Sequence, residues 1–107
     1  MSQGNLDSAA SLLAESLQCL EQLGDRRGIA VSTLYLATLA RYRKEYSTAR
    51  SMAQESLSVA QRMGDRVTYG ISLSELGMLD FLLGNLRDAA QMRQESLAAL
   101  LQTNERL

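Results

Sequence analysis

An internal repeat of 40 residues constrains this chain more than any other feature of its sequence. The tripeptide Glu-Ser-Leu recurs at this spacing, beginning at Glu15, Glu55 and Glu95. Residues 4–43 aligned without gaps to residues 44–83 share eleven identical positions, and residues 4–27 share eleven with residues 84–107. A fixed period of this length is the signature of a repeat array, in which each unit packs against its neighbours.

The composition favours helices along the whole chain. Proline is absent and 46% of the 107 residues are hydrophobic. Alanine, leucine, glutamine, glutamate and arginine, which are good helix formers, are abundant, and long runs of β-branched residues do not occur. This length suits one domain. We therefore expect a single all-α domain over residues 1–107, with repeat units 4–43 and 44–83 and a partial unit 84–107.

Two kinds of break divide each unit into helices. A glycine, which readily adopts the left-handed conformation that ends a helix, precedes an aspartate, which caps the next helix, at Gly24-Asp25 and Gly64-Asp65. A second break lies near Lys44-Glu45 and Gly84-Asn85. These breaks leave only two or three residues between helices, so sequential helices must run antiparallel. The breaks predict five helices, over about residues 5–23, 26–42, 46–63, 66–82 and 86–102.

The segment 66–82 differs from the others because apolar residues occur on all its sides. A helix of this kind is usually covered by neighbours, so we expect it to be sandwiched between two helices. Gly77 lies in its interior, where glycine lowers helix propensity. A close approach of another helix at Gly77 is the natural explanation.

The residue types that carry catalysis are scarce. Histidine is absent and Cys19 is the single cysteine. Cys19 lies within an apolar helical pattern, so we expect a buried small hydrophobe rather than a reactive thiol. The repeated glutamates occur once per unit, which indicates a packing or solubility role, with repeated arginines such as Arg26 and Arg66 as candidate partners. We expect no enzymatic activity, no metal site and no cofactor.

The charge pattern argues against nucleic acid as a partner. The chain has 11 basic and 12 acidic residues, whereas non-specific nucleic-acid binding needs a clustered positive surface. The nearest basic cluster, formed by Arg41, Arg43 and Lys44, is interrupted by Glu45. No stretch reaches the roughly 20 apolar residues of a membrane helix, and the first residues have no signal-peptide pattern. We expect a cytoplasmic protein without a membrane partner.

Several strings resemble the tetratricopeptide repeat family, in its longer variety of about 40 residues per unit. They are Leu36-Ala37 and Leu76-Gly77 in the first helix of a pair, Gly-Asn-Leu-x-x-Ala at residues 4–9 and 84–89, and Glu-Ser-Leu followed by Gly-Asp-Arg. Such arrays are typical of large bacterial signalling and transcriptional regulators. The resemblance implies a right-handed α-solenoid of antiparallel helix pairs. The chain departs from the family where a tyrosine is common, since Ala40 and Asp80 stand there.

The resemblance also implies a binding surface. In this family the first helix of each pair lines a concave face that holds a protein or peptide. The residues that it places there are Tyr35, Thr38, Arg41, Tyr42, Ser74, Glu75, Met78 and Phe81. Two alternatives remain open, a regulatory sensor segment that binds a small effector and a self-assembling structural unit.

The register of the repeat predicts exposed apolar ends. The chain begins and ends with the second helix of a pair, and neither terminal helix has an obvious polar cap of the kind that closes solenoids. Exposed leucines tend to find partners, so we expect a piece of a longer protein or a homo-oligomer. The leucines concerned are Leu12, Leu13, Leu17 and Leu20 at one end and Leu97, Leu100 and Leu101 at the other.

Overall fold

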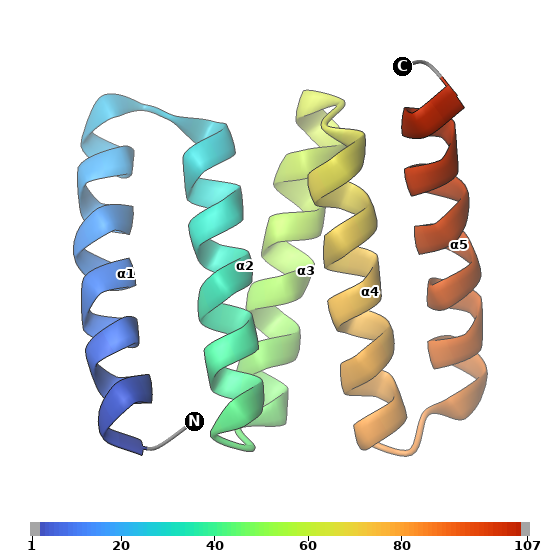
Figure 1. The fold of residues 1–107 in the computed structure, drawn as a ribbon, viewed down its shortest axis with the longest axis horizontal. Helices are drawn as coiled ribbons and strands as arrows, with labels where there is room; N and C mark the ends of the chain where they lie inside the picture. The colour runs from blue at the N-terminus through green and yellow to red at the C-terminus, as the bar shows by residue number, and fades with distance from the viewer. Residues whose placement is uncertain (1–2, 106–107) are drawn as a thin grey trace.

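The computed structural model describes residues 3–105, and this range folds into five α-helices joined by short turns. Figure 1 shows that they follow one another across the molecule in chain order, each running opposite to the one before. The all-α prediction is confirmed, and residues 1–2 and 106–107 of the predicted domain lie outside the described range. The helices are α1 (Gln3–Leu23), α2 (Arg26–Tyr42), α3 (Tyr46–Met63), α4 (Arg66–Leu82) and α5 (Leu86–Glu105).

The Gly-Asp breaks work as the sequence predicts. Gly24 and Gly64 have φ angles of 69° and 70°, the left-handed conformation that glycine adopts without steric cost. Asp25 then accepts a hydrogen bond of 2.9 Å from the backbone N–H of Gly28, and Asp65 accepts one of 3.2 Å from that of Thr68. These caps satisfy N–H groups that have no partner within α2 and α4.

The core is built from small residues on α2 and α3 and from leucines on α4. Alanines allow the helix backbones to approach closely, and two leucines with no exposed surface fill the space between them. In addition to α3, α4 contacts α2 directly, so the first helices of the two pairs form one continuous row. The core residues are Ala37, Ala40, Ala49, Ala53, Leu76 and Leu79.

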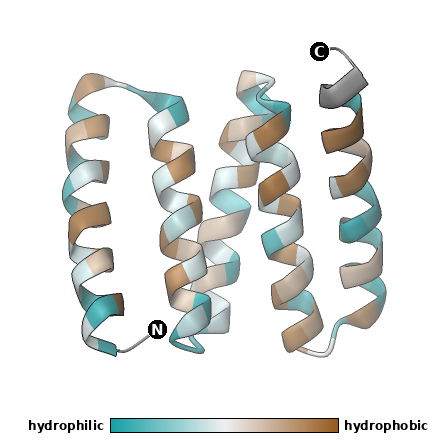
Figure 2. Ribbon diagram, viewed as in Figure 1, coloured by the Kyte–Doolittle hydropathy of each residue, from teal (hydrophilic) through white to brown (hydrophobic). Residues whose placement is uncertain are grey.

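Helix α4 packs between α3 and α5, which confirms the prediction of a sandwiched helix, but a further side of α4 is open to solvent. Leu73, Leu76 and Leu79 are buried. In contrast, Met78 and Phe81 are 47% and 60% exposed. Figure 2 shows apolar residues along the length of α4. The apolar character on all sides therefore reflects a buried face and an exposed apolar face on the same helix.

Cys19 is exposed, which corrects the prediction of a buried thiol. The apolar pattern of α1 marks one of its sides for burial, but the side that carries Cys19 has no neighbouring helix. Leu12 on the same side is 65% exposed. The prediction of exposed terminal leucines holds for Leu12, Leu97 and Leu101, whereas Leu13, Leu17, Leu20 and Leu100 are half-buried.

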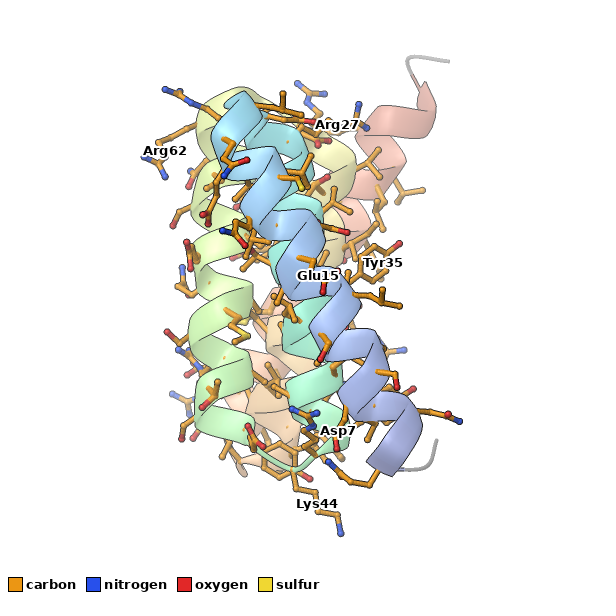
Figure 3. The ribbon with its side chains drawn as sticks, turned by 90° about the vertical axis from the view of Figure 1, so that its left-hand side faces the viewer. Asp7, Glu15, Arg27, Tyr35, Lys44 and Arg62 are labelled. Carbon is orange, nitrogen blue, oxygen red and sulfur yellow. The ribbon has the colours of Figure 1, made fainter. Side chains whose placement is uncertain are left out.

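The repeated glutamates are exposed, and the expected pairing with Arg26 and Arg66 is not among the ion pairs of the described residues. Other groups form these pairs instead. Arg27 and Asp65 join the starts of α2 and α4, while Arg43 at the end of α2 binds Asp7 of α1, which Figure 3 labels. Within residues 3–105, no helix has the length and apolarity needed to cross a bilayer.

Candidate partner-binding face

All eight residues of the predicted binding surface lie on the first helices, α2 and α4, and we call this surface the α2–α4 face. Five of them are exposed to solvent, and three form hydrogen bonds with one another. The exposed residues are Tyr35, Tyr42, Ser74, Met78 and Phe81, and the bonded residues are Thr38, Arg41 and Glu75.

The carboxylate of Glu75 joins α4 to α2. Thr38 Oγ1 donates a hydrogen bond of 2.6 Å to Glu75 Oε1, and Arg41 Nε donates one of 2.7 Å to Glu75 Oε2. Thr38 and Arg41 are three residues apart, which places them on the same side of α2. The side chain of Glu75 is only 7% exposed, so these charge-assisted bonds compensate for its removal from water. These three residues therefore hold the two helices together.

Arg41 also contacts its neighbour Tyr42. Its guanidinium carbon lies 5.0 Å from the centre of the Tyr42 ring, within the range of a cation–π contact. Arg41 thus contacts both the buried Glu75 and the Tyr42 ring, which is 55% exposed. The hydroxyl end of such a ring favours a wet boundary, and its apolar body favours contact with a partner.

An apolar stripe runs along the open side of α4. Its residues follow one another at steps of three or four, so they lie on one face of the helix. Four of the five are large and apolar, with exposed fractions between 40% and 60%. A contiguous exposed apolar patch of this kind is typical of an interaction site. We call Val67, Ile71, Ser74, Met78 and Phe81 the α4 stripe.

Tyr35 extends the α2–α4 face towards α1. It is 59% exposed. Figure 3 views the molecule from the α1 side and shows Tyr35 projecting beside α1, on the side away from α3. Tyr35 and the α4 stripe thus lie on either side of the Thr38–Glu75–Arg41 bonds.

Sequence reasoning missed a second polar centre around Asp80. Asp80 is fully buried, and its Oδ1 accepts hydrogen bonds from Arg50 Nε at 3.1 Å and from Asn85 Nδ2 at 3.4 Å. The other oxygen, Oδ2, has no hydrogen-bond partner. The signal in the sequence was the departure from the repeat, because Ala40 occupies the equivalent position and Ala10 is equivalent to Arg50. This centre connects α3 and α4 with the turn that leads to α5.

A shallow pocket of about 210 Å³ lies where the end of α3 and the start of α4 meet α5. Sites for small ligands usually measure about 300–1,000 Å³. Burial raises the pKa of Asp65 at its rim, but hydrogen bonds from the Thr68 hydroxyl and backbone N–H, with the charge of Arg27, outweigh burial and lower this pKa below 3.8. The carboxylate therefore already has its partners. The pocket is lined by Ala60, Gln61, Gly64, Asp65, Arg66, Tyr69, Ala99 and Gln102.

The α2–α4 face offers apolar contact and hydrogen bonding rather than acid–base or metal chemistry. The α4 stripe holds no ionisable side chain. Among the residues that the structure describes, no group of three or more histidine, cysteine, aspartate or glutamate side chains is placed to hold a metal ion. Aromatic residues and methionine, both present here, are enriched at protein interfaces.

Comparison with known proteins gives a family match. A family model described as tetratricopeptide repeat matches residues 30–102, a span that covers most of both helix pairs and all eight residues of the α2–α4 face. No curated protein matches the chain.

Proposed function

The chain belongs to the tetratricopeptide repeat family, whose members generally mediate protein–protein interaction, and we propose that it is a non-enzymatic module that binds a peptide segment of a partner protein on its α2–α4 face. The observation that carries this proposal is the α4 stripe. Burying such apolar surface against a partner is the main source of binding free energy available on this face.

The mechanism is the display of side chains on a rigid support. The bonds of Glu75 to Thr38 and Arg41 fix α2 against α4 before any partner arrives. A preformed surface loses less conformational entropy on binding than a flexible one. Met78 adapts its shape to different apolar side chains, so the partner is best described as a segment with apolar anchors spaced to follow the α4 stripe.

We also propose that the module works in the cytoplasm, and the exposed thiol of Cys19 supports this setting. An exposed cysteine stays reduced in the cytosol, where disulfides are rare. The resemblance to repeat arrays of bacterial regulators supports a place inside a regulator of that kind. The sensor alternative has less support, because the pocket near Asp65 is smaller than usual sites for small ligands.

The test is a selection of displayed random peptides on the purified chain, followed by affinity measurements on the enriched peptides. We expect Met78→Glu together with Phe81→Glu to weaken binding at least about tenfold, or about 1.4 kcal/mol. Leu97→Glu together with Leu101→Glu is the matched control, because these leucines are 55% and 58% exposed on α5 and lie off the face. Circular dichroism checks that both variants keep their helices. Equal affinities for wild type and double variant would refute the proposal.

A further inference from the structure

Helix α1 exposes the side that the other second helices use to pack on their first helices. In the α2–α3 pair, Ser56 Oγ donates a hydrogen bond of 2.8 Å to the carbonyl oxygen of Ala30. In the α4–α5 pair, Ser96 Oγ donates one of 2.7 Å to the carbonyl oxygen of Gly70. Ser16 is the third serine of this series, and on α1 it is exposed.

Other residues on this side of α1 are also exposed, although their equivalents on α5 are partly covered. Leu12 is 65% exposed, whereas its equivalent on α5, Met92, is half-buried. Met92 lies beside Gly77 of α4, since a methyl group added at Gly77 would be 3.6 Å from Met92 Cβ. Cys19 is exposed, whereas its equivalent Ala99 is half-buried. We define the α1 stripe as Leu12, Ser16, Cys19 and Leu23.

The covered side of α5 shows what kind of helix fits the α1 stripe. Residues 4–27 and 84–107 agree at the packing positions Ala9/Ala89, Ser16/Ser96 and Leu20/Leu100. On α5 this side is covered by α4, whose Gly70 and Gly77 are seven residues apart. These glycines make room for Leu100 and Met92. In α2, Ala30 and Ala37 occupy the same two positions.

Tyr35 provides a second contact for such a helix. The equivalent residue on α4 is Glu75, which binds Thr38 and Arg41 of the preceding first helix. Tyr35 therefore faces the position that a first helix preceding α2 would occupy. Figure 3 shows Tyr35 open to solvent beside α1.

We propose that the α1 stripe and Tyr35 dock an amphipathic helix of a partner protein, antiparallel to α1, with glycine or alanine at two positions seven residues apart. The carbonyl oxygen of the first small residue accepts a hydrogen bond from the hydroxyl of Ser16, and the second small residue lies against Leu12. This site is separate from the α4 stripe and does not depend on the proposed function.

A second copy of the chain does not offer a first helix to the α1 stripe. Both terminal helices are second helices, so stacking α5 or α1 of one copy on α1 of another places two second helices together. In both complete pairs, the serine side of the second helix packs against a first helix. The contacts within the two pairs therefore favour a helix of first-helix type over self-association.

The probe is a synthetic peptide with the sequence of residues 66–82, in which lysine replaces the exposed Val67 and Ile71 for solubility. Titration of the labelled peptide with the full chain is followed by fluorescence anisotropy. The reaction rate of Cys19 with an aromatic disulfide reagent reports on the α1 stripe itself. We expect saturable binding, a reaction of Cys19 slowed several-fold, and affinity lowered at least about tenfold by Leu12→Arg.

Three controls separate this site from others. Leu97→Arg on the open side of α5 and the double variant Met78→Glu/Phe81→Glu leave the affinity unchanged if the peptide docks on α1. A peptide with leucine at both glycine positions does not bind. Binding that survives Leu12→Arg, or that leaves the Cys19 rate unchanged, overturns the proposal. So does a wild-type dimer in sedimentation analysis that becomes a monomer in Leu12→Arg, because a second copy is then the occupant.

Discussion

Ser56 donates a hydrogen bond of 2.8 Å to the carbonyl oxygen of Ala30, and this bond ties the second helix of a pair to the first. The same hydroxyl lies 3.1 Å from Ser72 Oγ on α4, so it links three helices. Together with the bond of Ser96 to Gly70, this contact explains the serine in the second and third copies of Glu-Ser-Leu. The serine makes a buried hydrogen bond, Leu57 packs against the core, and Glu55 stays in solvent.

The first prediction compares two serines in the same position of the repeat. We expect Ser56→Ala to lower the free energy of unfolding by about 1–2 kcal/mol, because a buried hydrogen bond to α2 is lost. Ser16→Ala makes the same chemical change on exposed surface, so we expect an effect within about 0.5 kcal/mol. Urea unfolding followed by circular dichroism measures both. Equal effects would show that the bond to Ala30 contributes nothing.

The second prediction concerns the fit of Gly70 against Leu100. A methyl group at position 70 would lie 2.9 Å from Leu100 Cγ. We expect Gly70→Ala to destabilise the fold by about 1 kcal/mol, because overpacking outweighs the gain in helix propensity. Adding Leu100→Ala reproduces the equivalent pair Ala30 and Ala60. The double variant should therefore be more stable than the sum of the single effects predicts, by about 1 kcal/mol in a double-mutant cycle. Strict additivity contradicts this.

The helix order was predictable from the sequence because the signals that set it are local. Gly64 and Asp65 each act on the backbone within a few residues, so their positions fixed the end of α3 and the start of α4. The exposure of Cys19 was not predictable in the same way. An apolar pattern identifies a helix face that suits burial, but it does not say whether another helix is present to cover that face.

The candidate face was predictable as a set of helix positions but not as a set of contacts. The repeat identifies which positions are equivalent, and it placed Thr38, Arg41 and Glu75 on first helices. The period does not tell which position of one helix faces which position of the next. The bonds between these three residues, and the buried pair of Arg50 and Asp80, depend on that geometry.

The third prediction follows from the lowered pKa of Asp65. A carboxyl group with a lower pKa in the folded state stabilises the fold above its unfolded pKa of about 3.9, and this contribution disappears as the pH falls through the folded pKa. Asp65→Asn keeps a capping side chain but does not titrate. We expect the stability difference between wild type and Asp65→Asn to be largest near neutral pH and to shrink below about pH 4. Urea unfolding at a series of pH values measures it, and a constant difference would contradict the role of Asp65.

The last prediction uses the repeat to replace a buried ion pair. Arg50→Ala removes the cation from Asp80, whose carboxylate is fully buried and whose Oδ2 already lacks a partner. We expect a loss of about 2–3 kcal/mol, below the usual cost of breaking a buried pair because the Arg50 side chain is 39% exposed. Arg50→Ala with Asp80→Ala reproduces the equivalent pair Ala10 and Ala40 of the preceding unit.

This double variant should regain most of the lost stability, because replacing both partners of a buried pair by apolar residues is often neutral. Thermal and urea unfolding of the wild type, both single variants and the double variant complete the cycle. If the double variant is as unstable as Arg50→Ala alone, Asp80 supports the fold mainly through Asn85 and the turn to α5. That outcome would indicate that the buried carboxylate stabilises the α4–α5 connection rather than the contact between α3 and α4.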